Sequence, residues 1–255
     1  MRALVGGGSK GIGLGCAVAL AQAGATVTVM GRSADTLDEA RSSLPQPLDQ
    51  THGAMTVDFS DWKAVRAAAK ADVSDNGPVQ ILINNTGGPA PGPLAEAGAA
   101  ALTNGFEMHI LCNQALVHET KDGMIEAGYG RIINIISSSV VTPIPNLGVS
   151  NTIRGAVAQW GKTLAAELAP HGITVNNILP GSIDTSRLRT TMGRMAERSG
   201  KSIEQVERAA LEAIPAGRLG NPSDIGTVVA FLASPDASYV TGVNLPVDGG
   251  RLAVQ

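Results

Sequence analysis

The chain has 255 residues, of which 44% are hydrophobic and 16% are charged. This size predicts one globular domain spanning residues 1–255, which can bury a core without disulfide bonds. A formal net charge of -3 offers no basic surface for nucleic acid or for an anionic membrane, so we expect neither partner. The two cysteines, Cys16 and Cys112, lack the close spacing of metal ligands, and we predict buried thiols in a reducing compartment and no metal site.

Short apolar runs alternate with amphipathic segments along the chain. This pattern is typical of a parallel sheet with helices on both faces, and it predicts an α/β fold with a doubly wound sheet of about seven strands. The predicted strands cover residues 3–5, 26–30, 54–57, 81–83, 131–136, 174–178 and 243–247.

Helices are expected in the intervals between these strands. The periodic segment 12–23 predicts a helix that ends at Gly24, and segment 61–72 shows a similar pattern. Residues 186–214 break the alternation and are rich in Arg, Met and Glu, which predicts a helical insertion over the sheet that acts as a substrate lid. No repeat or long linker divides the chain.

The beginning of the chain runs directly into a glycine-rich loop after the first predicted strand. We therefore expect no signal peptide ahead of the fold. No apolar run reaches the ~18 residues that a membrane span needs. Both observations favour a cytoplasmic enzyme or binding protein.

The glycine-rich loop has the spacing Gly7-x-x-x-Gly11-x-Gly13, between a strand and a helix. In that context glycines let the backbone approach a pyrophosphate at the helix N-terminus. A tight turn without a ligand is the alternative. A nucleoside triphosphate loop is excluded because no Gly-Lys-Ser/Thr follows at the required position.

The end of the second predicted strand indicates which dinucleotide is bound. An acidic residue there would bind a ribose 2′-hydroxyl, but the sequence reads Met30-Gly31-Arg32-Ser33. Arg32 can pair with a 2′-phosphate, and Lys10 adds a second positive charge. The sequence thus favours NADP(H), with two solvated surface cations as the alternative.

Several further motifs follow in order along almost the whole chain. They are Asp58, Asn84-Asn85-Thr86-Gly87, Gly-Arg-Ile-Ile-Asn-Ile at 130–135, Gly-Ile-Thr-Val-Asn at 172–176, Pro-Gly-Ser-Ile-Asp-Thr at 180–185, Gly-Arg-Leu-Gly at 217–220 and Val-Asp-Gly-Gly at 247–250. In this order they resemble the short-chain dehydrogenase/reductase family, and in layout the bacterial 3-oxoacyl-acyl-carrier-protein reductases. The resemblance implies a Rossmann-type fold and a small-molecule substrate.

The resemblance also implies roles in cofactor binding. Asp58 would lie at the adenine, Asn85 would line the cofactor, and Ile183 and Thr185 would contact the nicotinamide carboxamide. The other cofactor-binding positions implied are Gly7, Ser9, Lys10, Gly11, Ile12, Gly13, Arg32, Ser33, Gly87, Arg154, Pro180 and Gly181. By the same resemblance, the chain should form a homodimer or homotetramer through the helices that carry His109 and Arg154 and through the final strand.

The catalytic set of the family is Asn, Ser, Tyr and Lys, and only the serine is retained, as Ser137. His109 stands at the asparagine position, Ser150 at the tyrosine position and Arg154 at the lysine position. The chain's two tyrosines, Tyr129 and Tyr239, align with structural positions and offer no obvious substitute.

The replacements change the chemistry in a definite way. Arg154 keeps a cation that can hold ribose hydroxyls, but it stays protonated and cannot relay a proton. The Ser150 hydroxyl is a poorer acid than a phenol and is better suited to donating a hydrogen bond. His109 titrates near neutrality and could deliver a proton, although a helical histidine is more often packed or solvated.

The sequence therefore predicts an NADPH-dependent reductase of a ketone or 3-oxoacyl compound, with Ser137, Ser150, Arg154 and His109 as the catalytic candidates. Conjugate reduction of an enone and an inactive dinucleotide-binding sensor or partner subunit are the alternatives. Five cations against one carboxylate in segment 186–201 make an anionic substrate plausible, unless they form only a solvated helix face.

Overall fold

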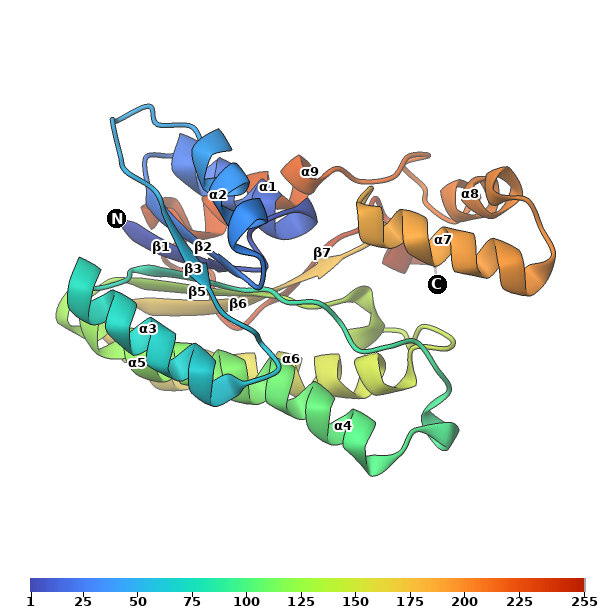
Figure 1. Ribbon diagram of the computed structural model, residues 1–255, viewed down its shortest axis with the longest axis horizontal. Coiled ribbons are helices and arrows are strands. Elements are labelled where there is room, and N and C mark those ends of the chain that lie inside the picture. Colours follow the sequence, from blue (N-terminus) through green and yellow to red (C-terminus); the bar gives the residue numbers. More distant parts are fainter. Residues whose placement is uncertain (255) are drawn as a thin grey trace.

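The structure, a computed structural model, describes residues 1–254 and is built around a sheet of seven parallel strands (Figure 1). The strands lie in the order β3-β2-β1-β4-β5-β6-β7. The predicted fold class is confirmed, and every predicted strand lies within two residues of its observed bounds at each end. These bounds are β1 (Arg2–Gly6), β2 (Thr26–Gly31), β3 (Gly53–Thr56), β4 (Ile81–Asn84), β5 (Gly130–Ile135), β6 (Ile173–Pro180) and β7 (Asn244–Val247).

Helices cover both faces of this sheet because its strands present apolar side chains in both directions. Val5 and Ile83 belong to a core shared with α1, α2 and α9, whereas Leu4 and Leu82 belong to a core shared with α3, α5 and α6 (Figure 1). The helices are α1 (Gly11–Gln22), α2 (Ala34–Ser43), α3 (Trp62–Asn76), α4 (Ala99–Phe106), α5 (Cys112–Glu126), α6 (Gly148–Leu168), α7 (Ser186–Ser199), α8 (Ile203–Glu212) and α9 (Pro222–Leu232).

The strand order reverses direction between β1 and β4, which are adjacent in the sheet. In a doubly wound sheet, the crevice outside the carboxyl ends of the strands at such a reversal is where ligands bind. The loops after β1 and β4 both leave the sheet at this edge. The topology therefore brings the glycine-rich loop and the Asn84-Asn85-Thr86-Gly87 motif together.

Helix α1 follows the glycine-rich loop and packs closely on α9. A methyl group built on Gly226 of α9 would lie 2.4 Å from the carbonyl oxygen of Gly15 in α1, so only glycines allow this approach. The predicted helix at 12–23 is confirmed with a shift of one residue at each end. Gly24 has the left-handed backbone conformation, with φ of 88°, that favours glycine after a helix.

A chain of buried asparagines ties the second half of the sheet together. The side-chain amide of Asn84 donates to Asn134 at 2.8 Å, Asn134 donates to Asn177 at 2.8 Å, and Asn177 donates to Asn244 at 2.8 Å. These residues lie on β4, β5, β6 and β7 respectively. The network fixes the strands whose carboxyl ends form the site.

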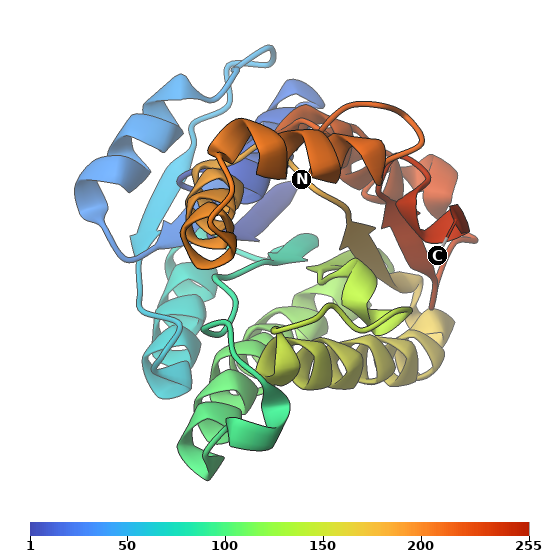
Figure 2. The ribbon, with the colours of Figure 1, turned by 90° about the vertical axis from the view of Figure 1, so that its right-hand side faces the viewer.

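Residues 186–214, predicted as a helical insertion, form helices α7 and α8 beyond the carboxyl edge of the sheet (Figures 1 and 2). Buried Met192, Ala196 and Val206 join the two helices in a small core of their own. Closure of these helices over a substrate stays a prediction.

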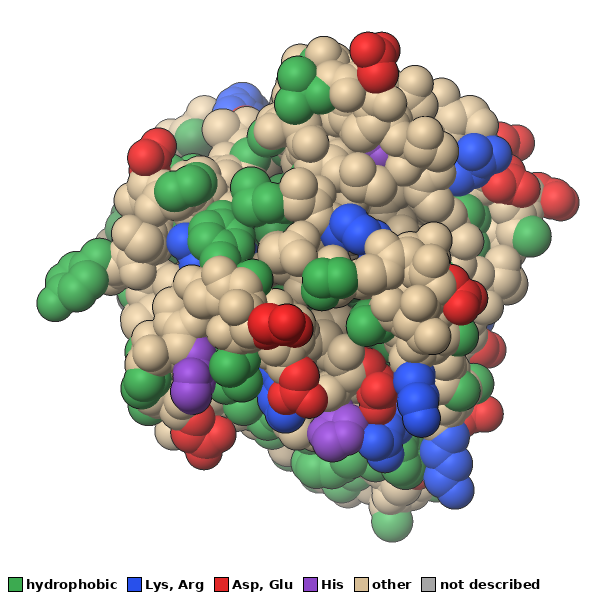
Figure 3. All heavy atoms as spheres, turned by 90° about the vertical axis from the view of Figure 1, so that its left-hand side faces the viewer, with side chains coloured by type: hydrophobic (Ala, Val, Ile, Leu, Met, Phe, Trp, Pro, Cys, Tyr) green, Lys and Arg blue, Asp and Glu red, His purple; other side chains and the backbone are tan. Residues whose placement is uncertain are grey.

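On the face shown in Figure 3, Lys and Arg side chains lie beside Asp and Glu side chains. Within residues 1–254, none of the helices combines the length and the apolar character that a bilayer crossing requires. Cys16 and Cys112 are both free and buried, as predicted, and burial raises the pKa of each thiol to about 12.

Candidate active site

The glycine-rich loop is packed against Asn85 at the end of β4. The side-chain amide of Asn85 donates to the carbonyl oxygen of Gly6 at 2.9 Å. A methyl group on Gly13 would lie 2.1 Å from the carbonyl oxygen of Gly7, and Gly7 itself has φ of 55°. Gly11 likewise has φ of 58°, so all three spaced positions of this loop favour glycine.

The start of α1 is suited to an anion. Lys10 precedes the helix without a capping hydrogen bond from its side chain, and the first turn contains no acidic residue. Backbone N–H groups at such a helix start are unsatisfied and carry partial positive charge, which favours a diphosphate. The residues at this position fit the cofactor that the sequence predicts.

The end of β2 places two predicted coenzyme residues on the surface beside the glycine-rich loop. Arg32 and Ser33 are exposed, and the Ser9 hydroxyl oxygen lies 3.9 Å from the position of a methyl group built on Gly31. Asp58 follows β3, where hydrogen bonding to Ser60, chiefly from its backbone N–H, together with the positive charge of Arg32, lowers the pKa of Asp58. The structure thus brings Ser9, Arg32 and Asp58 together at the predicted adenosine end.

The turn after β6 supplies the predicted nicotinamide contacts. Gly181 donates from its backbone N–H to Val247 at 3.0 Å, and buried Ile183 pairs with Gly220 in an isolated bridge. Thr185 caps α7 by accepting a hydrogen bond from the N–H of Leu188. A methyl group on Gly11 would lie 3.2 Å from Thr185 Cγ2, so this turn reaches the glycine-rich loop.

Ser137 and Arg154 both lie at the carboxyl end of β5. The Ser137 hydroxyl accepts a hydrogen bond from the backbone N–H of Ser139 at 3.1 Å, which leaves its own proton available. Arg154, in α6, is only 7% exposed, and its Nη1 donates to the carbonyl oxygen of Ile135 at 3.1 Å. Ser137 thus lies two residues after Ile135, the residue whose carbonyl oxygen accepts the hydrogen bond from Arg154.

Ser150 lies one turn before Arg154 in α6 and is 8% exposed. Residues four apart share a helix face, so both point to the same side of α6. Neither tyrosine substitutes for the missing phenol. The Tyr129 hydroxyl donates to Ala233 at 2.5 Å and its ring contacts Arg131, while Tyr239 is fully exposed.

His109 lies in a single π-helical turn, Glu107–Leu111, between α4 and α5. π-Helical turns of this kind often occur at functional sites. The imidazole is 1% exposed, and its Nε2 has no hydrogen-bond partner within the described residues. Burial, followed by the positive charges of Arg154 and Arg187, lowers the pKa of His109 to about 2. At neutral pH the imidazole is uncharged, so it can form a hydrogen bond but holds no acidic proton to release.

Arg187 is the residue at this site that the sequence analysis did not single out. It was counted only as one of several cations in segment 186–201, yet it lies two residues after Thr185 and faces Gly88. The other cations have different partners or surroundings: Arg189 pairs with Asp184 at 2.9 Å, and Arg194 is exposed. The proximity to Thr185 was the signal in the sequence.

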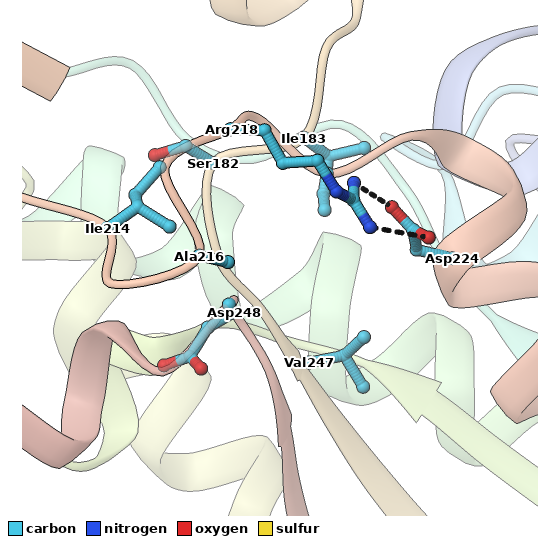
Figure 4. Close-up of a pocket in the computed structure, with 10 residues that line it drawn as sticks. Ser182, Ile183, Ile214, Ala216, Arg218, Asp224, Val247 and Asp248 are labelled. Atoms are coloured by element: carbon cyan, nitrogen blue, oxygen red, sulfur yellow. Dashed lines mark hydrogen bonds and ion pairs between the residues drawn. The ribbon is translucent and has the colours of Figure 1, made fainter. Parts of the chain in front are cut away.

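A cavity of about 260 Å³ lies next to this site, on the β7 side of Ile183 (Figure 4). The carboxylates that line it already have partners: Asp224 pairs with Arg218 at 2.7 Å, and Asp248 accepts from the N–H groups of Gly250 and Leu252. None of the four catalytic candidates lines it. We therefore assign this cavity to the packing of the strand ends and α9, and place the candidate site between Ser137, Arg154 and Arg187.

Comparison with known proteins identifies the class. A family model described as enoyl-(acyl carrier protein) reductase matches residues 7–251. The 3-oxoacyl-[acyl-carrier-protein] reductase FabG of Vibrio cholerae is 33% identical over 255 residues, which cover 99% of this chain and 97% of that protein. The chain belongs to the short-chain dehydrogenase/reductase family, as its motifs predicted.

Solved structures agree with this assignment. The L-sorbose reductase of Gluconobacter frateurii, in complex with NADPH and L-sorbose, is 29% identical with a TM-score of 0.92, covering 98% of this chain and 96% of that one. YwfH, an NADPH-dependent reductase involved in bacilysin biosynthesis, is 27% identical with a TM-score of 0.92, covering 98% and 97%. The roles of individual site residues in this chain stay predictions.

Proposed function

We propose that this chain, an NADP(H)-dependent oxidoreductase of the short-chain family, reduces the carbonyl group of a ketone or 3-oxoacyl compound. The observation that carries the proposal is the pair formed by Ser137 and buried Arg154 at the end of β5, beside the turn that contains Thr185. Two relatives with high structural similarity are named as an NADPH-dependent reductase and as an L-sorbose reductase in complex with NADPH, which supports the choice of cofactor and of a reduction.

The residues of the chain have distinct tasks in this reaction. When bound, NADPH supplies a hydride from its nicotinamide ring to the carbonyl carbon. The Ser137 hydroxyl donates a hydrogen bond to the carbonyl oxygen, and Arg154 adds positive potential as negative charge develops there. The Ser150 hydroxyl, on the same face of α6, offers a second donor. A proton from water then completes the alcohol, because burial and nearby charge keep His109 neutral and Ser150 stands at the position of the phenol.

The missing phenol lowers the rate without abolishing the reaction. General acid catalysis typically contributes about 10²- to 10⁴-fold. Holding the reacting atoms in near-attack geometry contributes about 7–11 kcal/mol, which corresponds to a larger acceleration. An enzyme that still positions the substrate and stabilises the oxyanion therefore retains most of its rate acceleration.

Conjugate reduction of an enone is the second candidate, and one observation favours it. His109 is held neutral by its surroundings, and the phenol position carries Ser150, so no side chain at the site delivers a proton easily. Hydride addition to a conjugated C=C produces an enolate, whose oxygen needs stabilisation by donors rather than immediate protonation. Ser137, Ser150 and Arg154 provide such donors.

Consumption of NADPH with matched substrates tests the proposal. We expect turnover with a ketone or a 3-oxoacyl thioester, and the product should be the alcohol. Turnover of enones alone, with a saturated ketone as product, would instead support conjugate reduction. Tight NADPH binding without turnover of any of these compounds would contradict both and leave a dinucleotide-binding sensor or partner subunit.

We also propose an oligomeric state and a cellular location for the enzyme, both on the basis of its family. We expect a homodimer or homotetramer in the cytoplasm, with α5, α6 and β7 at the interfaces. The fully exposed ring of Tyr239 lies close before β7 and would be covered in such an assembly. Size-exclusion chromatography with light scattering measures the state directly, and a monomer would contradict this expectation.

A further inference from the structure

Two arginines at the candidate site have no carboxylate partner. Arg154 is buried and uses Nη1 to bind the carbonyl oxygen of Ile135. Arg187, in the first turn of α7, lies against Gly88 on the loop after β4. Neither guanidinium forms an ion pair among the residues that the structure describes, whereas Arg189 and Arg218 close by each pair with an aspartate. The positive charge at the site is therefore uncompensated.

The two guanidinium groups are close enough to affect each other and His109. Burial, then the charge of Arg187, lowers the pKa of Arg154 to about 10. Burial of part of the Arg187 side chain lowers its pKa as well, but Arg187 is an exposed residue, so the buried unpaired charge is that of Arg154. Buried charges in proteins are ordinarily paired because an unpaired one is costly. An anion between these groups would remove that cost.

The imidazole of His109 provides an independent sign of a ligand. Its Nε2 is buried and has no hydrogen-bond partner among residues 1–254, and buried polar atoms in folded proteins are nearly always satisfied by protein, water or ligand. The neutral ring can donate a hydrogen bond to an oxygen atom. The positive charges that lower the pKa of His109 are those of the same two arginines, Arg154 and Arg187.

We propose that Arg187, together with Arg154, binds a carboxylate of the substrate, so that among carbonyl compounds the enzyme prefers free oxo acids to neutral ketones and carrier-linked thioesters. This inference rests on the proposed carbonyl reduction and names its substrate class. The planar guanidinium of Arg187 suits a carboxylate because two parallel N–H groups can bind both oxygens.

Other residues are suited to the phosphates of the cofactor, which is why the anion is assigned to the substrate. The diphosphate fits the uncapped start of α1, and the 2′-phosphate fits Arg32 at the end of β2. Arg187 instead follows Thr185 and acts on His109 and Arg154, at the end of the site where the hydride is transferred.

The decisive experiment compares acids with their esters. Binding of 2-oxohexanoate, 3-oxohexanoate and their methyl esters to the NADP⁺-loaded enzyme is measured by calorimetry, and NADPH oxidation is measured with the same four compounds. The variants are Arg187→Gln, Arg187→Lys and, as a control, Arg194→Gln. The control removes the same charge from an exposed position two turns further along α7.

We expect at least one acid to bind the wild-type enzyme more tightly than its ester. Arg187→Gln should weaken binding of that acid by about 10- to 100-fold, the typical effect of losing a hydrogen bond to a charged group. Arg187→Lys should restore part of the affinity. The ester and NADPH should bind all variants equally, and Arg194→Gln should behave as the wild type.

Three results would overturn the proposal: equal binding of acids and esters, no binding of either acid, or a weakening of NADPH binding by Arg187→Gln with the acid preference unchanged. The last would assign Arg187 to a cofactor phosphate. Failure of the proposed carbonyl reduction has a different signature, because the acids would then bind selectively while no NADPH is oxidised.

Discussion

The guanidinium of Arg187 lies directly on the backbone of Gly88. A methyl group built on Gly88 would be 2.5 Å from Nη2, closer than real contacts, and 3.1 Å from Nη1, which is tight. Gly88 does not have the left-handed backbone that glycine favours, so the constraint is one of space alone. The absence of a side chain at Gly88 thus leaves the space that the guanidinium of Arg187 occupies.

Gly88→Ala should consequently displace Arg187 without unfolding the protein. The obstructing atoms belong to the end of a flexible side chain, so the melting temperature should hardly change, whereas oxo-acid binding should weaken in the same direction as in Arg187→Gln. Gly92→Ala is the control on the same loop, because nothing lies within 4 Å of a methyl group there. Unchanged acid binding in Gly88→Ala would show that this contact does not position Arg187.

Coenzyme preference should depend on Arg32. Replacing it with alanine removes the exposed cation at the end of β2, and we expect the KM for NADPH to rise by about 10- to 100-fold, since a hydrogen bond to a charged phosphate is lost. The KM for NADH should not change, because that coenzyme has no 2′-phosphate. Arg41→Ala, which removes an exposed arginine paired with Asp38 in α2, serves as the control. An equal effect on both coenzymes would contradict the assignment.

The stability of the protein should fall in mild acid because of His109. Its pKa is lowered from the ordinary 6.5 to about 2 in the folded state, so above pH 6.5 the group is neutral whether folded or unfolded. Below that pH, His109 becomes protonated in the unfolded chain but stays neutral in the folded protein. The contribution to the free energy of unfolding then falls by up to about 1.4 kcal/mol per pH unit until the folded pKa is reached.

Urea unfolding between about pH 7.5 and pH 5 measures this slope, provided that the native state stays intact over the range. His109→Asn should flatten it, whereas His118→Gln, at a half-exposed position, should leave it unchanged. Equal slopes in the wild type and His109→Asn would show that His109 is not held neutral.

Much of this site was predictable from the sequence because its elements are defined locally. Each strand is a short apolar run between polar or glycine residues, and Ser137 follows one such run directly. Ser150 and Arg154 are four residues apart in a helix, so their shared face follows from helical spacing alone.

Two features depended on tertiary structure and were missed. The π-helical turn at 107–111 adds a residue to one turn, which changes the direction of His109 relative to a regular α-helix, and the sequence shows only an ordinary helical pattern there. The contact of Arg187 with Gly88 depends on how α7 is placed over the sheet. The composition of segment 186–201 does not distinguish Arg187 from Arg194. It also does not show whether these cations bind a substrate or form a solvated helix face.

The asparagine network should contribute measurably to stability. Asn134 is fully buried, donates to Asn177 and accepts from Asn84. Asn134→Ala leaves the Nδ2 of Asn84 and the Oδ1 of Asn177 without a partner. Each unsatisfied buried group costs about 1–3 kcal/mol, so we expect a loss of about 2–5 kcal/mol in the free energy of unfolding. Asn104→Ala, at an exposed position in α4, is the control for urea unfolding. A loss below about 1 kcal/mol would mean that water replaces the missing amide.

The missing phenol can be restored to measure what its absence costs. The double variant Ser150→Tyr with Arg154→Lys recreates the donor and the relay that related enzymes carry on this face of α6. If only the donor separates this chain from its relatives, turnover of a simple ketone should rise by about 10²- to 10⁴-fold, the usual contribution of general acid catalysis.

Its matched control is Ser150→Phe with Arg154→Lys, which fills the same space without a hydroxyl. A gain in the tyrosine variant alone assigns the effect to the phenol, and the gain should diminish at high pH as the phenol ionises. Equal turnover in the two variants, with NADPH binding intact in both, would contradict this account. It would mean that the surroundings of Ser150, including the uncompensated charge of Arg187, have diverged together with the catalytic residue, so that a proton donor by itself no longer serves the substrate this site accepts.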